Sequence, residues 1–260
     1  MKACSVEDKL ARSLSSETSE ILPYLPYLLQ DLWELGSSPR DMLEMLKTHT
    51  NVSSDTKVLD LACGKGAVSI LLAKELACRV RGIDLMPEFI AYAEHKAEEW
   101  GVYDFCTFLV SDIIQAVESE RDHDIVILGA VGDVLGDPGQ TLALLTKTVK
   151  SGGYILIDDG YGSESGSEEY YTRAQWLRFI ASAGAELIGE KPVEKEELAS
   201  INREQLTHII KRAEELKVLH PEKVLLFDGY IEGQRAECIE VENEITGVTL
   251  LLRTWHGYGA

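Results

Sequence analysis

The chain has 260 residues, 45% of them apolar, and a formal net charge of -19 at pH 7. This acidity argues against a nucleic-acid backbone or an anionic membrane surface as the main partner and favours neutral or cationic molecules. The sequence has no run of about 18 apolar residues that would cross a membrane, and its polar N-terminus lacks the apolar core of a secretory signal. Five widely spaced cysteines indicate reduced thiols, so we expect a cytoplasmic location.

The first 54 residues are predicted to be helical after a polar arm of about 19 residues. Apolar residues recur at helical spacing from Tyr27 onward, Pro26 suits a first helical turn, and Gly36 suits a helix end. A second helix is predicted from Pro39 to Thr48. Because these helices precede the first strand of the chain, we expect them to fold over its tip.

The stretch from Val58 to Ala73 predicts a strand, a glycine turn and a helix. The apolar run reaches Asp60, and Gly64 and Gly66 lack the Cβ that would keep a ligand away from the backbone. The helix that follows directs its positive end to the same place. A second apolar run ends in Asp84, whose carboxylate is suited to accept hydrogen bonds from the two hydroxyls of a ribose.

Strands and helices alternate regularly up to residue 158. Further apolar runs at 105–110, 124–128 and 154–157 end in polar or glycine tips, and helices are predicted at 87–100 and near 139–150. Near-continuously apolar strands separated by helices indicate an α/β fold with a doubly wound, mostly parallel sheet. In such a sheet the ligand lies beyond the carboxyl ends of the strands, where the strand order reverses.

The rest of the chain is expected to govern substrate choice. Residues 160–167 are predicted to form a polar loop, which would lie beside the site. Residues 185–188 are predicted to form a sixth strand. A helical pair, broken at His220-Pro221, fills about 194–244 before a last strand at 247–253. We expect this pair to form a cap, a homodimer contact or both. His208 and His220 have no metal-ligand spacing, so no metal site is expected.

These motifs, in this order, resemble the class I S-adenosylmethionine-dependent methyltransferases. The similarity covers about residues 55–190 and the last strand: Leu59–Gly66 resembles the first motif of the family, Gly82–Leu85 its second-strand acid and Val110–Ile113 its adenine-side acid. His123–Gly129 and Ser151–Ile157 resemble the fourth strand and the glycine turn into the fifth. The resemblance implies a seven-stranded Rossmann-like sheet whose last strand is antiparallel.

The same resemblance implies a division of the chain and a set of cofactor contacts. The division is an N-terminal helical segment over the site (1–54), a cofactor-binding core (55–192), an inserted helical cap (193–245) and the last strand with the C-terminus (246–260). The expected cofactor is S-adenosyl-L-methionine. Its implied contacts are Asp60, Ala62, Cys63, Gly64 and Gly66 at the methionine end, Asp84 at the ribose, Leu85, Met86, Asp112 and Ile113 at the adenine, and Gly129 and Ala130 beside the sulfonium.

Two details of the first loop bear on rival functions. Ala62 stands where the family often has a glycine, and a nicotinamide dehydrogenase would need that glycine. Lys65 is followed by Gly66 and not by Ser or Thr, which excludes a phosphate-binding nucleotide loop.

The expected reaction is in-line methyl transfer to a nitrogen or oxygen nucleophile of a small neutral or cationic molecule. Candidates for a catalytic base are Asp133, Asp158, Asp159 and Tyr161, at the carboxyl ends of strands four and five. Carboxylates at these positions would equally attract a cationic substrate without accepting a proton. Two alternatives stay open, a non-catalytic cofactor-binding or protein-interaction module on the same fold and an enzyme that methylates a protein.

Overall fold

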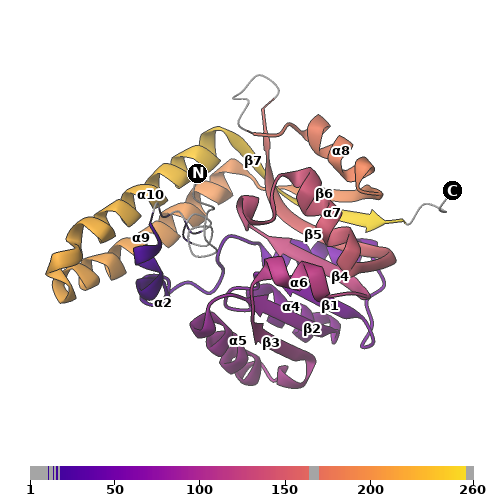
Figure 1. Ribbon diagram of the computed structural model, residues 1–260, viewed down its shortest axis with the longest axis horizontal. Coiled ribbons are helices and arrows are strands. Elements are labelled where there is room, and N and C mark those ends of the chain that lie inside the picture. The colour runs from indigo at the N-terminus through magenta and orange to yellow at the C-terminus, as the bar shows by residue number, and fades with distance from the viewer. Residues whose placement is uncertain (1–10, 12–13, 15, 17, 164–169, 256–260) are drawn as a thin grey trace.

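The centre of the fold is a seven-stranded sheet in a computed structural model that describes residues 11, 14, 16, 18–163 and 170–255 (Figure 1). Its strand order is β3-β2-β1-β4-β5-β7-β6. β7 runs antiparallel to both of its neighbours, and the other strands are parallel to one another. The expected fold class is confirmed. The strands are β1 (Lys57–Leu61), β2 (Arg79–Asp84), β3 (Cys106–Val110), β4 (His123–Gly129), β5 (Val149–Gly162), β6 (Ala185–Pro192) and β7 (Ile245–Thr254).

Successive side chains of a strand point to opposite faces of the sheet. Because the strands are apolar on both faces, each face is covered by helices, three on either side. Ile155 and Ile157 pack with the helices α6, α7 and α8. Leu156, between them, packs with α3, α4 and α5 on the other face. The near-continuous apolar runs of the sequence therefore fill two cores. The helices are α3 (Pro39–His49), α4 (Ala67–Leu76), α5 (Pro87–Glu99), α6 (Ile113–Ser119), α7 (Pro138–Thr148) and α8 (Arg173–Ser182), with short 3-10 turns η2 (Tyr103–Phe105) and η3 (Gly132–Leu135).

A third apolar cluster joins the N-terminal segment to the inserted helical pair. The pair consists of α9 (Lys195–Leu219) and α10 (Val224–Asn243), separated by the turn η4 (Pro221–Lys223), and it projects from the sheet beside α2 (Figure 1). Its buried side chains meet those of η1 (Ser19–Tyr24) and α2 (Leu25–Leu28). The cluster contains Ile21, Leu25, Leu28, Ile209, Ala213, Leu216, Phe227, Tyr230 and Ile231. Neither α9 nor α10, nor any other helix in the described part of the chain, is both long and apolar enough to span a membrane.

The prediction of a helix that runs from Tyr27 to Gly36 is wrong in its length. α2 ends at Leu28, and turns follow up to α3. A longer α-helix would use the carbonyls of Leu29 and Leu32 for amides four residues later. Here both carbonyls accept hydrogen bonds from the ammonium of Lys65. A tertiary contact thus overrides the local helical spacing, and Gly36, with a φ of 109°, lies in a loop.

The polar loop expected at 160–167 is also partly wrong. Residues up to Gly162 belong to β5 and pair with β7, for example Gly160 with Gly247. Backbone pairing with a full-length last strand accounts for this extension. Residues 164–169 lie outside the described part of the chain, as does most of the expected N-terminal arm.

One backbone feature yields a stability prediction. Ala77 ends α4 in a left-handed conformation with a φ of 53°, and its side chain is exposed. Glycine lacks the Cβ that strains this conformation. We expect Ala77→Gly to raise the free energy of unfolding by about 1 kcal/mol, measured by urea denaturation.

The matched control is the same substitution in a right-handed helix. Ala143 is exposed in the middle of α7, and Ala143→Gly is expected to lower the free energy of unfolding by about 1 kcal/mol. A loss of stability in both variants would contradict the assignment of strain to Ala77.

Candidate functional site

The strand order reverses between β1 and β4, which lie side by side with Leu61 opposite Leu128. The chain leaves β1 toward β2 and leaves β4 toward β5, so the two loops part at this point. Both loops begin with an alanine in the left-handed region, Ala62 with a φ of 56° and Ala130 with a φ of 51°. This is the position at which open α/β sheets bind ligands.

The loop after β1 is held in place through its backbone. The amide of Cys63 donates to the carbonyl of Ile83 at 3.0 Å. Gly66 has a φ of 75°, and a Cβ built on it would lie 2.8 Å from the Cβ of Ala93. A side chain at Gly66 would therefore be strained and would also separate α4 from α5.

Asp84 ties this loop to the end of β2. One carboxylate oxygen accepts from the amide of Gly64 at 2.9 Å, and the other accepts from the amide of Met86 at 2.9 Å. The side chain is buried, and burial raises the pKa of Asp84, while the two amides favour the charged form. The carboxylate thus fixes Met86, one of the two expected adenine contacts after β2, and Met86 is buried as part of the third cluster.

Asp60 and Asp112 lie on either side of Asp84 in the strand order. Asp60 is buried and accepts a hydrogen bond from the hydroxyl of Ser69 at 2.5 Å. Burial, with a smaller contribution from the charge of Asp84, raises the pKa of Asp60 to about 7. Asp112 caps α6 by accepting from the amide of Ile114 at 2.9 Å. The role of Ser69 was not predicted, since a serine one helical turn into an apolar helix gives no distinct signal.

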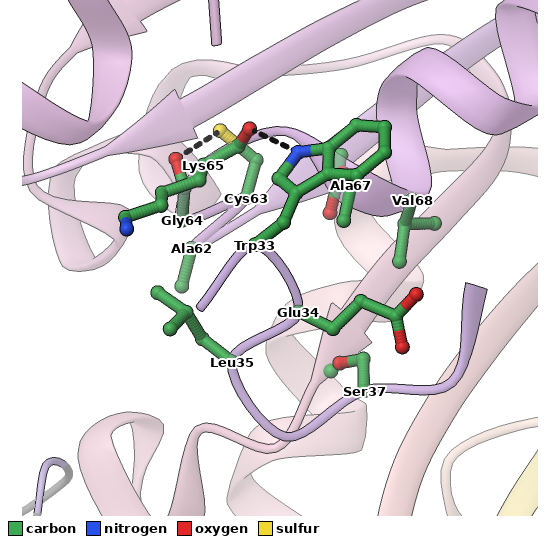
Figure 2. A pocket seen from close by; sticks show the side chains of 12 residues that line it. Trp33, Glu34, Leu35, Ser37, Ala62, Cys63, Gly64, Lys65, Ala67 and Val68 are labelled. Carbon is green, nitrogen blue, oxygen red and sulfur yellow. Dashed lines mark hydrogen bonds between the residues drawn. The ribbon is translucent and has the colours of Figure 1, made fainter. Parts of the chain in front are cut away.

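Residues 29–38, which we call the lid segment, lie over the two loops. The methyl carbon of Leu35 is 3.3 Å from the position of a Cβ built on Gly64, and the hydroxyl of Ser37 is 2.0 Å from that of a Cβ built on Gly129. The indole N–H of Trp33 donates to the carbonyl of Lys65 at 3.0 Å, as Figure 2 shows. A cavity of about 40 Å³ remains between the lid segment and the loops.

Lys65 connects the loop to the lid segment from the other side. Its side chain is 3% exposed and runs away from Trp33 (Figure 2), and its ammonium donates to the carbonyls of Leu29 at 2.5 Å and Leu32 at 2.7 Å. Burial lowers the pKa of Lys65 to about 8, so the group stays charged at neutral pH. In the sequence this lysine served only to exclude a phosphate-binding loop. Its role in holding the lid segment could not be predicted, because its partners lie more than 30 positions away.

Of the expected catalytic residues, Asp158 is the one that contacts the lid segment. Its carboxylate accepts from the amide of Ser38 at 3.1 Å and from the hydroxyl of Thr249 at 2.5 Å. The side chain is half-buried, and burial raises the pKa of Asp158 to about 6.

The other three expected catalytic residues have different surroundings. Tyr161 is buried and donates its hydroxyl hydrogen to Glu190 at 2.9 Å, and Glu190 is paired with Arg173 at 2.8 Å. Asp159 is exposed and accepts from the amide of Gly160. Asp133 is exposed in η3, after β4. The structure therefore does not bring these four side chains together.

Residues 52–223 match the sequence profile of a family described as "Methyltransferase domain". The chain belongs to this methyltransferase family. The resemblance read from the sequence motifs is thus confirmed at the level of the family, together with the enzyme class and the fold.

Relatives of this methyltransferase match it over part of their length. A ribosomal protein L11 methyltransferase of Dechloromonas aromatica is 32% identical over 143 residues, which are 55% of this chain and 45% of that protein. The chain thus spans less than half of that relative.

Solved structures resemble the methyltransferase over nearly its full length. A SAM-dependent methyltransferase from Geobacter sulfurreducens, in complex with S-adenosyl-L-homocysteine, has a TM-score of 0.73 and 18% identity over 88% of this chain and 97% of that one. The [4+2]-cyclase SpnF has a TM-score of 0.71 and 15% identity, over 96% of this chain and 95% of the cyclase chain. At these identities the likeness shows the fold, which hosts more than one chemistry.

The buried Asp60 yields a prediction for stability against pH. The folded chain keeps the proton of Asp60 up to about pH 7, whereas an unfolded aspartate loses it near the ordinary value of 3.8. Between these values the folded state binds more protons, so the stability contributed by this group falls as pH rises, by about 1.4 kcal/mol per pH unit. We expect the unfolding free energy of the wild type to fall, relative to Asp60→Asn, across this window in urea denaturation.

The control is Asp104→Asn, which changes an exposed carboxylate in η2. Its stability should follow the wild type at every pH. Parallel curves for the wild type and Asp60→Asn would contradict the raised pKa of Asp60.

Proposed function

We propose that the chain is an S-adenosylmethionine-dependent methyltransferase that transfers a methyl group to a nitrogen or oxygen atom of a small neutral or cationic molecule. The observation that carries this proposal is the lid segment. Leu35 and Ser37 lie directly over Gly64 and Gly129, so the lid segment covers part of the strand ends at the switch point. An enclosed centre keeps water away from the reacting atoms and suits a small substrate better than the surface of a protein.

The residues at the switch point fit this cofactor. Carboxylates end or follow β2 and β3, where a ribose and an adenine amino group need acceptors, and the glycine loop exposes its backbone beside them. We assign the adenosine part to Asp84, Leu85, Met86, Asp112 and Ile113, and the methionine part to Asp60, Ala62, Cys63, Gly64, Gly66, Gly129 and Ala130. The cofactor supplies a methyl group that is already activated on a sulfonium.

The chain then has to position the substrate, exclude water and accept a proton. Burial raises the pKa of both Asp158 and Asp159 to about 6, so either could accept a proton near neutral pH. We assign the proton to Asp158 because its carboxylate lies under the lid segment. Asp133 and Asp159, being exposed, are assigned to the attraction of a cationic substrate. Tyr161 is a donor to Glu190 and is assigned to the support of the β5 end.

The similarity to the L11 methyltransferase does not favour a ribosomal substrate. It leaves almost half of this chain and more than half of that protein unmatched. The match therefore does not carry the substrate of that protein over to this chain. The lid segment and the α9–α10 pair, which we propose to face the substrate, meet each other in the third apolar cluster.

We propose a homodimer through α9 and α10, supported by the exposed apolar side chains of Ile201 and Ile239. A cytoplasmic location is supported by the free thiols of the four cysteines in the described part of the chain. The division at residues 54, 192 and 245 is supported by the element boundaries between α3 and β1, β6 and α9, and α10 and β7.

The decisive measurement is calorimetric titration with S-adenosylhomocysteine. We expect a dissociation constant in the micromolar range, about -8 kcal/mol. Asp84→Asn should weaken binding at least about tenfold, since an amide cannot accept hydrogen bonds with both of its terminal atoms. With labelled S-adenosylmethionine, the methyl group should be transferred to members of a panel of small amines and hydroxyl compounds.

Asp104→Asn is the control for the titration, and ribosomal protein L11 is the competing substrate. An intact, folded sample that does not bind S-adenosylhomocysteine would remove the cofactor assignment and favour an interaction module. Transfer to L11 in preference to every small compound would overturn the substrate class.

The assignment of Asp158 predicts a pH profile. A general base acts in its deprotonated form, so kcat/KM should rise with pH through about 6 and then level off. Asp158→Asn should lower kcat by about 100-fold or more while leaving the affinity for S-adenosylhomocysteine unchanged. The control is Asp104→Asn, which changes an exposed carboxylate in η2. Equal activity in the wild type and Asp158→Asn would remove Asp158 from the reaction.

A further inference from the structure

Lys65 is a buried cation whose hydrogen bonds all go to one segment of the chain. Its ammonium donates to the carbonyls of Leu29 and Leu32 and lies 4.9 Å from the ring centre of Tyr92 and 5.7 Å from that of Phe89. Removing an ammonium from water is costly, and charge-assisted hydrogen bonds and aromatic faces offset part of this cost. An apolar side chain would fill the same place without that cost, so stability alone does not account for a lysine here.

The backbone of Lys65 binds the same segment as its side chain. The carbonyl of Lys65 accepts the indole N–H of Trp33 at 3.0 Å. Lys65 thus holds the lid segment at three points while it stands between Gly64 and Gly66, the two glycines of the loop with positive φ. A displacement of the lid segment must therefore break the contacts of Lys65 or move the loop with it.

The enclosed space shows why such a displacement is needed. The cavity between the lid segment and the loops has a volume of about 40 Å³, whereas pockets that hold drug-sized ligands have volumes of about 300 to 1,000 Å³. Leu35 and Ser37 take up the space over Gly64 and Gly129. A ligand that approaches these glycines has to displace the lid segment first.

We propose that Lys65 is a positioning residue that latches the lid segment onto the cofactor loop, and that release of this latch sets the rate at which the cofactor enters and leaves. The inference rests on the proposed function for the identity of the ligand. The latch itself rests on the three hydrogen bonds between Lys65 and residues 29–33.

Lys65→Met tests the latch because methionine fills a similar volume and makes none of the ammonium hydrogen bonds. If the open form is rare in the wild type, the apparent association rate is reduced by its population. We expect the amides of Leu32 and Ser38, which are hydrogen-bonded in the structure, to exchange with deuterium at least about tenfold faster in the variant. We also expect S-adenosylhomocysteine to associate and dissociate at least about tenfold faster, followed by tryptophan fluorescence in a stopped-flow instrument.

Lys96→Met is the matched control. Lys96 also lies near the rings of Tyr92 and Trp33, at 5.7 Å and 6.0 Å from their centres. Within the described part of the chain, however, its ammonium pairs with Glu99 and not with the lid carbonyls. This variant should keep wild-type exchange and binding rates. Trp33→Phe removes the third bond and keeps an aromatic ring, so it should accelerate exchange in the same segment even if Lys65→Met fails to fold.

The outcomes separate the latch from the proposed function. Wild-type exchange of the lid amides in Lys65→Met, or in Trp33→Phe if the first variant does not fold, overturns the latch whether or not the ligand binds. Faster exchange with unchanged association and dissociation also overturns it, because the lid would then not control entry. Exchange that accelerates equally in β1 and β4 would show general destabilisation and overturn the positioning role. Failure of the wild type to bind S-adenosylhomocysteine overturns the proposed function and with it the role in cofactor entry, while the exchange result still decides whether the latch exists.

Discussion

The site depends on the carboxylate of Asp84, which joins three parts of the backbone. By accepting hydrogen bonds from Gly64 and Met86, it fixes the loop after β1, the end of β2 and the start of α5 relative to one another. Gly64, one of the two left-handed glycines of the loop, donates its amide to this carboxylate, and the lid segment lies on the same loop. A buried carboxylate is stable here because backbone amides replace part of its lost hydration.

The core of the site was predictable because its signals are local. Apolar runs that end in Asp60, Asp84 and Gly129 give the strands, and parallel strands bring their carboxyl ends to one edge of the sheet. The lid segment was not predictable in the same way. Its apolar residues have helical spacing, and the interaction that unwinds it comes from Lys65, far along the chain. Local propensity is a weak guide wherever a buried polar contact competes for the same carbonyls.

The catalytic candidates illustrate a second limit. Asp158, Asp159 and Tyr161 follow one another on β5, and the sequence placed them together at its end. Side chains alternate between the faces of a strand, so Asp158 faces the lid segment, on the side of Leu156, whereas Tyr161 packs into the opposite core. Which face carries the chemistry depends on where the N-terminal segment crosses the sheet, and the strand sequence itself does not contain that information.

The interruption of the N-terminal helix is therefore part of how the site is closed. A continuous α-helix from Tyr27 to Gly36 would direct the carbonyls of Leu29 and Leu32 along its axis, toward amides four residues later. In the structure the carbonyl of Leu29 accepts from the amide of Leu32 and from the ammonium of Lys65. With α2 ending at Leu28, both carbonyls reach Lys65, and the chain turns so that Leu35 and Ser37 reach the two glycine positions. A short segment held by a few hydrogen bonds also opens at a lower cost than a packed helix. The same unwinding that encloses the reacting centre thus leaves the lid able to admit the molecules on which the proposed reaction depends.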